Sequence, residues 1–218
     1  MNELIVKNLY HNYDNADKVT KVLKGVNVSF ESGKLYAIMG ESGSGKTTLI
    51  SLIAALDNIM EGDILYNGKS IKEIGNQKFR LNYVNIVFQS YNLIKYMNAR
   101  ENVEIAIDFA KIKSNVKNYA YELLDSVGID KECADRLVLK LSGGEQQRVA
   151  IARSMVGNEP IMVADEPTGN LDEETEEKIM NIFKKLASDG KIVIIVTHSK
   201  EVSKYADVVY KMKKGVIN

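Results

Sequence analysis

Residues 40–47 read GESGSGKT, a glycine-rich segment with the spacing of a phosphate-binding loop. The pattern G-x-x-x-x-G-K-[ST] lets successive backbone N–H groups turn inward around phosphate oxygens. In such a loop Lys46 reaches the β- and γ-phosphates, and the hydroxyl of Thr47 binds Mg²⁺. The flanking runs KLYAIM and TTLISLIAAL predict the strand and the helix that this motif requires. We therefore expect a phosphate site formed by Gly40, Glu41, Ser42, Gly43, Ser44, Gly45, Lys46, Thr47 and Thr48.

A second segment, LSGGEQQRVAIARS at residues 141–154, also begins like a helix that could hold an anion. Ser142 and Glu145 have the spacing of a capping box, in which two side chains satisfy the first free N–H groups of a helix. A capping box does not explain Gly143 and Gly144, because glycine weakens a helical turn. The two glycines predict that another group approaches closely.

Adjacent carboxylates, Asp165 and Glu166, follow the apolar run IMVA. An acidic residue at the carboxyl end of a buried parallel strand lies at the crevice where α/β proteins bind ligands. We expect Asp165 to hold Mg²⁺ and Glu166 to polarise the attacking water. The pair alone would indicate no more than the start of a loop, but beside a phosphate loop it indicates a catalytic site.

Three further side chains are candidates for the same site. His198 follows the run KIVIIVT, and Gln89 follows NIVF, so both come directly after predicted strands. A lone histidine is more often structural, although at this edge it could contact a γ-phosphate or the attacking water. Tyr10 or Tyr13 could stack on adenine, and physical spacing does not choose between them.

The order of predicted elements indicates an α/β fold. The runs IMVAD and KIVIIVT are continuously apolar, as in strands buried on both faces, and a helix at residues 172–188 separates them. Strand, helix and strand in this order predict a parallel sheet. Asn67 and Gly68 predict a hairpin turn. Residues 90–139 predict helices without a clear strand, which indicates a helical insertion into the sheet.

Bulk composition narrows the class of protein. At 218 residues the chain fits one large domain, and 29 basic side chains balance 29 acidic ones, so the sequence lacks the basic excess of a nucleic-acid binder. The single cysteine, Cys133, fits a reducing compartment. The start of the chain does not have the pattern of a signal peptide, and the apolar segment Leu49–Leu56 is too short for a membrane helix. We expect a cytoplasmic chain.

Together these residues resemble the nucleotide-binding subunit of ABC transporters. GESGSGKT is similar to Walker A, VFQ to the Q-loop, LSGGE to the signature, IMVADE to Walker B, GNLD to the D-loop and VTHS to the switch histidine, all in the family order. The resemblance implies an α/β P-loop NTPase of ABC type, with a mainly parallel sheet core, an N-terminal antiparallel β-subdomain and an inserted helical subdomain. It implies a single ABC ATPase domain at 1–218, with its core at about 1–89 and 141–218 and the helical subdomain at about 90–140.

The resemblance also implies roles for the site residues. ATP and Mg²⁺ are the expected cofactors, and Tyr13 rather than Tyr10 is the adenine-stacking ring. Ser142, Gly143, Gly144 and Glu145 would cap the γ-phosphate of ATP held by a second copy, packed head to tail. The implied catalytic residues are Glu166, His198 and Gln89, and the implied metal ligands are Thr47, Gln89 and Asp165.

The implied partners are a second copy of the chain and a membrane permease, with no nucleic acid. The motifs ADEPTGNLD and FQSYNLI resemble the bacterial branch that serves lipoprotein release, macrolide or antimicrobial-peptide export or resistance, and division-site signalling. The resemblance places the chain at the inner face of the cell membrane, with export of or resistance to peptides or other amphiphiles as its role, or signalling through a non-transporting complex. We expect the permease to bind around Ser90–Arg100, where Tyr91, Leu93, Ile94, Tyr96 and Met97 supply apolar area.

Other ATP- and GTP-binding classes fit less well. A soluble P-loop kinase would fit in size and charge, but it leaves LSGGE, GNLD and His198 without a role. A chromosome-associated ATPase needs a long coiled coil, and the sequence has no heptad tract. A GTPase is disfavoured because no N-K-x-D motif occurs.

Overall fold

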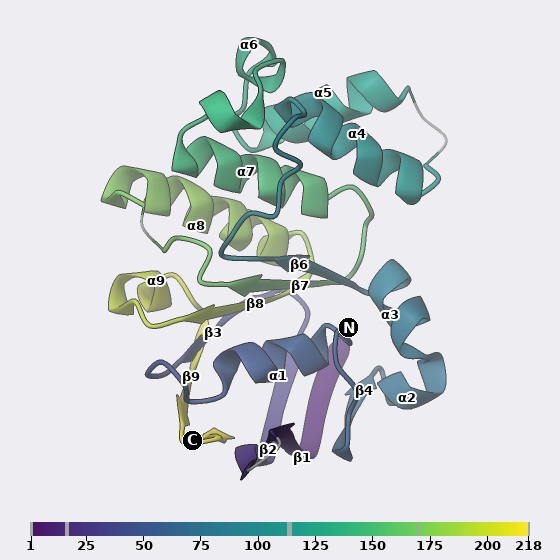
Figure 1. Ribbon diagram of the computed structural model, residues 1–218, viewed down its shortest axis with the longest axis vertical. Helices are drawn as coiled ribbons and strands as arrows, with labels where there is room; N and C mark the ends of the chain where they lie inside the picture. The colour runs from purple at the N-terminus through teal and green to yellow at the C-terminus, as the bar shows by residue number, and fades with distance from the viewer. Residues whose placement is uncertain (1, 16–17, 113–114, 170, 218) are drawn as a thin grey trace.

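The computed structural model describes residues 2–15, 18–112, 115–169 and 171–217. They form a mixed α/β fold with two sheets, as the sequence predicts (Figure 1). In the larger sheet the strand order is β10-β9-β3-β8-β7-β6. Neighbouring strands in it are parallel, except that β10 is antiparallel to β9. Its strands are β3 (Lys34–Met39), β6 (Val84–Val87), β7 (Ile161–Asp165), β8 (Ile192–Thr197), β9 (Val208–Lys213) and β10 (Val216–Ile217).

The smaller sheet is antiparallel and has the order β2-β1-β4-β5. The predicted turn at Asn67 and Gly68 joins β4 to β5, where Tyr66 pairs with Lys69. Both turn residues have positive φ, 48° and 79°, as the turn of a two-residue hairpin requires. The four strands are β1 (Glu3–Asn15), β2 (Lys18–Glu31), β4 (Glu61–Tyr66) and β5 (Lys69–Ser70).

Helices cover both faces of the larger sheet (Figure 1). Helix α1 (Lys46–Ile53) lies between the two sheets, and α2 (Ile71–Ile74) and α3 (Asn76–Asn82) follow β5. The opposite face carries α7 (Gly143–Ser154) and α8 (Glu173–Ser188), with α9 (Lys200–Lys204) after β8. The predicted helix at 172–188 is confirmed, because Asp172 is the N-cap of α8 and its side chain accepts from Thr175 N–H.

Within residues 90–140 the regular elements that the structure describes are helices, joined by turns and irregular segments, apart from an isolated bridge between Asn98 and Leu137. The segment contains α4 (Ala99–Phe109), α5 (Val116–Ser126), α6 (Lys131–Ala134) and a 3₁₀ turn, η1 (Val138–Lys140). Helices α4 and α5 lie beside α7 on the side away from the sheet (Figure 1). The division into a core at 1–89 and 141–218 and a separate subdomain at 90–140 stays a prediction.

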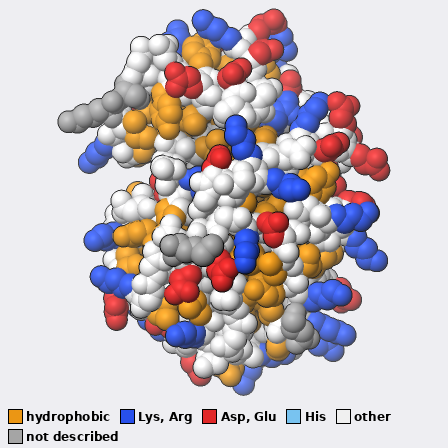
Figure 2. Space-filling view, turned by 180° about the vertical axis from the view of Figure 1, so that it is seen from behind, with side chains coloured by type: hydrophobic (Ala, Val, Ile, Leu, Met, Phe, Trp, Pro, Cys, Tyr) orange, Lys and Arg blue, Asp and Glu red, His pale blue; other side chains and the backbone are white. Residues whose placement is uncertain are grey.

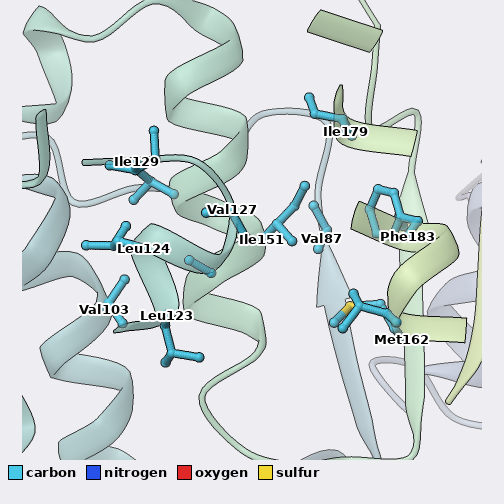
Figure 3. Close-up of a cluster of buried hydrophobic side chains, with 14 of the residues drawn as sticks. Val87, Val103, Leu123, Leu124, Val127, Ile129, Ile151, Met162, Ile179 and Phe183 are labelled. Atoms are coloured by element: carbon cyan, nitrogen blue, oxygen red, sulfur yellow. The ribbon is translucent and has the colours of Figure 1, made fainter. Parts of the chain in front are cut away.

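Two apolar cores lie on the two sides of the larger sheet. One joins α4, α5, α7 and α8 to the sheet, and Figure 3 shows Ile151 and Val87 between Leu124 on one side and Phe183 on the other. The other surrounds α1 between the sheets. The two cores therefore hold α1 and α7 on opposite faces of the same sheet.

The surface carries charges of both signs. Figure 2 shows lysine and arginine side chains interspersed with aspartate and glutamate over one face, in line with the balanced composition. None of the helices that the structure describes is long and apolar enough to cross a bilayer.

Candidate functional site

A cavity of about 680 Å³ opens at the carboxyl ends of β3, β7 and β8. Four of the segments that meet there end a strand of the larger sheet or follow one, and a fifth comes from β2 of the smaller sheet. Most of the predicted site residues line this cavity, together with one residue that sequence reasoning missed, Val22. The predicted ones are Glu41, Ser42, Gly43, Gly45, Lys46, Thr47, Thr48, Gln89, Asp165, Glu166 and His198.

The glycine-rich loop has a backbone that other residues adopt with strain. Gly43 and Gly45 have φ of 75° and 107°, and a Cβ at Gly40 would lie 2.3 Å from the carbonyl oxygen of Met212. Gly45 is the N-cap of α1 and supplies no side-chain cap, so the first N–H groups of this helix face the loop uncapped. Such a helix start binds phosphate. The buried hydroxyl of Ser44 has no hydrogen-bond partner among the described residues, so it is free to bind a phosphate oxygen as well.

Lys46 is buried and its ammonium lies across the loop. The Nζ atom donates to the carbonyl oxygens of Gly40 at 2.8 Å and Glu41 at 3.0 Å. A buried ammonium is stable only when such partners surround it. The side chain is therefore directed over the loop, where it can exchange carbonyl oxygens for phosphate oxygens.

The two predicted carboxylates differ in their surroundings. Asp165 is the last residue of β7, and burial raises the pKa of its carboxyl group, while the Thr47 hydroxyl and the Lys46 ammonium lower it and Glu166 raises it further. Among the described residues no cluster of three or more His, Cys, Asp or Glu side chains could hold a metal ion. The three predicted ligands, a hydroxyl, an amide and a carboxylate, do all line the cavity. This oxygen-rich set suits Mg²⁺.

Glu166 is held in a left-handed backbone conformation, with φ of 45°. Non-glycine residues adopt it at a cost, and such strain gathers at functional sites. Its N–H donates to the carbonyl of Val196 at 2.9 Å, which ties the turn to β8. The Oε1 atom lies 2.8 Å from Nδ1 of His198, so these two predicted catalytic residues are in contact. The Glu166 side chain is 14% exposed and that of His198 is 72% exposed.

The structure distinguishes the two candidate tyrosines. The hydroxyl of Tyr13 is 3.4 Å from Oγ1 of Thr48, which lines the cavity. The hydroxyl of Tyr10 instead lies over Gly25, 2.7 Å from where a Cβ would be. Tyr13 does not line the cavity itself but stands at its edge, 43% exposed. Tyr13 as the adenine-stacking ring stays a prediction.

The second predicted anion site does not join the first within one chain. Ser142 and Glu145 form the expected capping box, with Oγ accepting from Glu145 N–H at 3.2 Å and Oε2 accepting from Ser142 N–H at 2.7 Å. The Ser142 N–H lowers the pKa of the Glu145 carboxyl group. None of residues 142–145 lines the cavity, and α7 and α1 lie on opposite faces of the sheet.

The two signature glycines have different reasons to be glycine. A Cβ at Gly144 would lie 2.3 Å from Cγ2 of Thr175, so the close approach predicted there comes from α8 of the same chain. Gly143 is exposed, and a Cβ on it would meet the Tyr91 hydroxyl at 3.2 Å. The close approach that the sequence predicts is therefore met within the chain at Gly144, and an approach by another molecule at Gly143 stays a prediction.

The predicted docking segment is less exposed than expected. Tyr96 is 79% exposed, whereas Tyr91, Leu93, Ile94 and Met97 are half-buried. A groove of about 330 Å³ runs beside the segment and includes Ile94. Sequence reasoning missed the two most exposed apolar residues of this groove, Leu81 of α3 (66% exposed) and Phe109 of α4 (83% exposed).

Arg153, at the end of α7, was also missed. Its guanidinium donates to the carbonyl oxygens of Tyr91 at 2.9 Å and Asn92 at 2.7 Å, and it lines the groove. Both of these residues have positive φ, 57° and 51°. Burial lowers the pKa of Arg153, and no carboxylate pairs with it among the residues described. Arg153 thus holds a strained turn directly after Gln89.

The sequence is similar to known proteins over nearly its whole length. The sequence model of the ABC transporter family matches residues 23–169. YclH of Bacillus subtilis, described as an uncharacterized ABC transporter ATP-binding protein, is 45% identical over 201 residues, which cover 91% of this chain and 89% of that protein. The lipoprotein-releasing system ATP-binding protein LolD of Rickettsia bellii is 38% identical, with 99% and 97% covered. The macrolide export ATP-binding/permease protein MacB of Pasteurella multocida is 36% identical, and the chain spans 34% of its length.

The fold is similar to solved structures as well. Two dimeric structures of the Methanocaldococcus jannaschii protein MJ0796 superpose with TM-scores of 0.90 and 0.91 at 36% identity, covering 99% of this chain and 96% of theirs. One of the two is a post-hydrolysis state bound to ADP and Pi. The paired sheets and the helices on both faces are thus the architecture of that ATP-binding cassette.

Proposed function

This chain belongs to the ABC transporter family and is one of its ATP-binding ATPase subunits. We propose that two copies pack head to tail around two ATP molecules and hydrolyse them to drive a membrane permease. The observation that carries the proposal is the separation of the two anion sites. The cavity gathers the phosphate loop, Asp165, Glu166 and His198, but residues 142–145 lie elsewhere with Gly143 exposed. A second copy can bring its signature to the cavity of the first.

Each cavity binds the triphosphate through its own residues. Lys46 leaves the carbonyl oxygens of Gly40 and Glu41 for the β- and γ-phosphates, and the uncapped start of α1 donates N–H groups to them. Thr47, Gln89 and Asp165 would hold Mg²⁺, which neutralises charge on the phosphates when it is bound. Tyr13 stacks on the adenine at the edge of the cavity.

Glu166 and His198 act on the attacking water. The carboxylate of Glu166 accepts a hydrogen bond from that water and orients it toward the γ-phosphate. His198 is in contact with Glu166 Oε1 and is 72% exposed, so it can fix the direction of the carboxylate and would reach the γ-phosphate. Gln89 contacts the water or Mg²⁺ from the end of β6. The left-handed backbone of Glu166 aims the side chain in advance, which lowers the cost of reorganisation.

The signature completes the site from the partner copy. The start of α7 carries the partial positive charge of a helix N-terminus, and Gly143 has no side chain to keep a γ-phosphate away. Ser142 and Glu145 hold this helix start in shape through the capping box. ATP then bridges the two copies, and its hydrolysis removes the γ-phosphate that connects them.

The permease would bind in the groove beside the Q-loop. This groove is lined by Leu81, Ile94, Ile105 and Phe109, which form an apolar surface next to the strained turn that Arg153 holds. Its size suits a short cytoplasmic helix laid across it. Such a partner would keep the chain at the inner face of the membrane.

The branch of the family sets the range of transported substances. Relatives include proteins of lipoprotein release and macrolide export, which supports export of or resistance to peptides or other amphiphiles. A non-transporting signalling complex is the second candidate, because the cytoplasmic site would be the same. Substrate choice then belongs to the permease.

Mixing two inactive variants tests the head-to-tail arrangement. Lys46→Ala removes the phosphate lysine, and Gly143→Asp sets a negative charge at the signature, so each variant alone should lack ATPase activity. Aspartate in the first turn of a helix is favourable, so Gly143→Asp should fold. In a mixed dimer one composite site is intact, and an equal mixture should recover about a quarter of the parental activity.

A matched mixture serves as the control. Lys46→Ala with Glu166→Gln should stay inactive, because both substitutions damage the cavity and every composite site then contains one of them. Steady-state phosphate release measures all mixtures at concentrations where the parent is dimeric. A Lys46→Ala and Gly143→Asp mixture no more active than its parts would refute the composite site.

The groove has its own test. Phe109→Asp places a charge in the groove and should abolish copurification with a multispanning membrane protein from detergent-solubilised membranes, while ATPase activity of the free subunit is kept. Leu139→Asp is the control, since Leu139 is 65% exposed and does not line the groove. Equal recovery of the membrane protein with both variants would place the interface elsewhere.

A further inference from the structure

His11 occupies a buried position on β1, two residues before the candidate adenine-stacking ring. Leu9 is fully buried, His11 is 4% exposed and Tyr13 is 43% exposed, so this strand runs from the core to the edge of the nucleotide cavity. Buried strand positions mostly hold apolar side chains, because a polar one loses its hydration. A histidine at this place therefore calls for a physical reason.

One side of the imidazole faces a carboxylate. His11 Nε2 is 3.4 Å from Oδ2 of Asp57, which follows the end of α1. The other carboxylate oxygen of Asp57 accepts from Asn58 N–H at 2.7 Å, which restricts the orientation of this carboxylate, whose side chain is 41% exposed. His11 Nδ1 is buried and has no hydrogen-bond partner among the described residues. An unpaired buried nitrogen is costly, which makes a purely structural choice of histidine unfavourable.

The imidazole of His11 also pairs with the ring of Tyr13. The two ring centroids are 4.8 Å apart and the rings are nearly perpendicular, at 76°. Edge-on aromatic pairs of this kind have a preferred geometry and so restrict each other's orientation. From the other direction, the Tyr13 hydroxyl is 3.4 Å from Oγ1 of Thr48. Tyr13 is thus held between Thr48, near the start of α1, and His11, which Asp57 anchors after the end of the same helix.

We propose that His11 is a positioning residue for the base of ATP: anchored by Asp57, it sets the ring of Tyr13 at the angle at which adenine stacks. The inference rests on the proposed function, and in particular on Tyr13 as the stacking ring. His11 touches no nucleotide itself. Its contribution reaches the base alone, because the triphosphate is held by the phosphate loop on the other side of Thr48.

Two ligands distinguish the contribution of the base to binding from that of the phosphates. ATP carries both, whereas inorganic tripolyphosphate carries no base. The dissociation constant of tripolyphosphate divided by that of ATP therefore reports the stacking contribution. His11→Leu should weaken ATP by about twofold to tenfold, the range that an edge-on aromatic pair contributes, and leave tripolyphosphate unchanged. The KM for ATP should rise by the same factor with kcat unaltered. His11→Phe keeps the ring without the link to Asp57 and should fall between His11→Leu and the parent.

Leu9→Val is the matched control, because it perturbs the same buried strand without reaching Tyr13. It should lower thermal stability and leave the ratio of dissociation constants at the parental value. Should Tyr13→Ala reduce the ratio while His11→Leu does not, His11 is only a core residue and the inference is overturned. Should Tyr13→Ala leave the ratio unchanged, Tyr13 is not the stacking ring and the inference also falls. Loss of both ligands in Lys46→Ala would still support the ATPase site in either case.

Discussion

The paired signature glycines allow a sharp test, because the structure gives them opposite roles. A Cβ at Gly144 would lie 2.3 Å from Cγ2 of Thr175, well inside van der Waals contact. Gly144→Ala should therefore destabilise the fold, although alanine is the better helix former. At Gly143 a Cβ would meet only the ends of two side chains, the Tyr91 hydroxyl at 3.2 Å and Cδ2 of Leu171 at 3.5 Å, so Gly143→Ala should change stability little.

The size of the effect follows from two opposing contributions. Inserting a methyl group into a packed contact costs about 1–3 kcal/mol, while replacing a helical glycine by alanine returns up to about 1 kcal/mol. The expected net loss is therefore up to about 2 kcal/mol. For a chain of this length a loss of about 2 kcal/mol lowers the Tm by about 4–8 °C.

The companion substitution is Thr175→Ser, which removes the obstructing methyl group and keeps the hydroxyl that donates to Asp172 Oδ2 at 2.8 Å. In the double variant the overlap is gone and the helix gain of alanine remains, so its Tm should return to that of Thr175→Ser or exceed it. Calorimetric melts of the parent, both single variants and the double variant measure this coupling. Additive losses in the double variant would refute the reasoning that Thr175 is what excludes a side chain at Gly144.

Three further predictions follow from single contacts. Glu166→Gln should bind ATP but hydrolyse it far more slowly, and it should accumulate an ATP-bound dimer in light scattering; a normal turnover rate would move the catalytic role to another residue. Arg153→Lys supplies a point charge in place of two directed N–H groups, so kcat should fall by about tenfold, whereas Arg80→Lys, in the same groove, should keep it; equal kcat values for the two variants would contradict this. Burial raises the pKa of Cys133 to about 11, so at pH 8 the native thiol stays protonated and iodoacetamide should label it much more slowly than in urea; equal labelling rates would exclude a buried thiol.

Much of the fold was predictable because its signals are local. The hairpin at Asn67 and Gly68 needs two residues with positive φ, and few other dipeptides accept that backbone. The helix at 172–188 has an N-cap, an acidic first turn and an apolar stripe, and each of these follows from the sequence alone. Strands β7 and β8 are buried on both faces and so lack polar alternation.

The rest of the site depends on contacts between distant segments. Motif spacing places Lys46 after the loop that follows β3 and Asp165 at the end of β7, and parallel strands bring such ends together. Nothing local indicates that Thr175 crowds Gly144, 31 residues earlier, or that Arg153 reaches the turn after Gln89. The exposed side chain of Phe109 is on a helix with an ordinary amphipathic sequence, so the sequence alone could not predict the groove.

The arrangement of the two helix starts explains why ATP itself should control association. The starts of α1 and α7 both carry partial positive charge, and the sheet keeps them apart within one chain. In the proposed dimer the α1 start of one copy meets the α7 start of the other, and without an anion between them this contact is unfavourable. The triphosphate supplies the missing negative charge at that place, so ATP binding and dimer formation become one event. Once hydrolysis and release remove the γ-phosphate, the same two helix starts favour separation, and this alternation is what a permease docked in the groove can use.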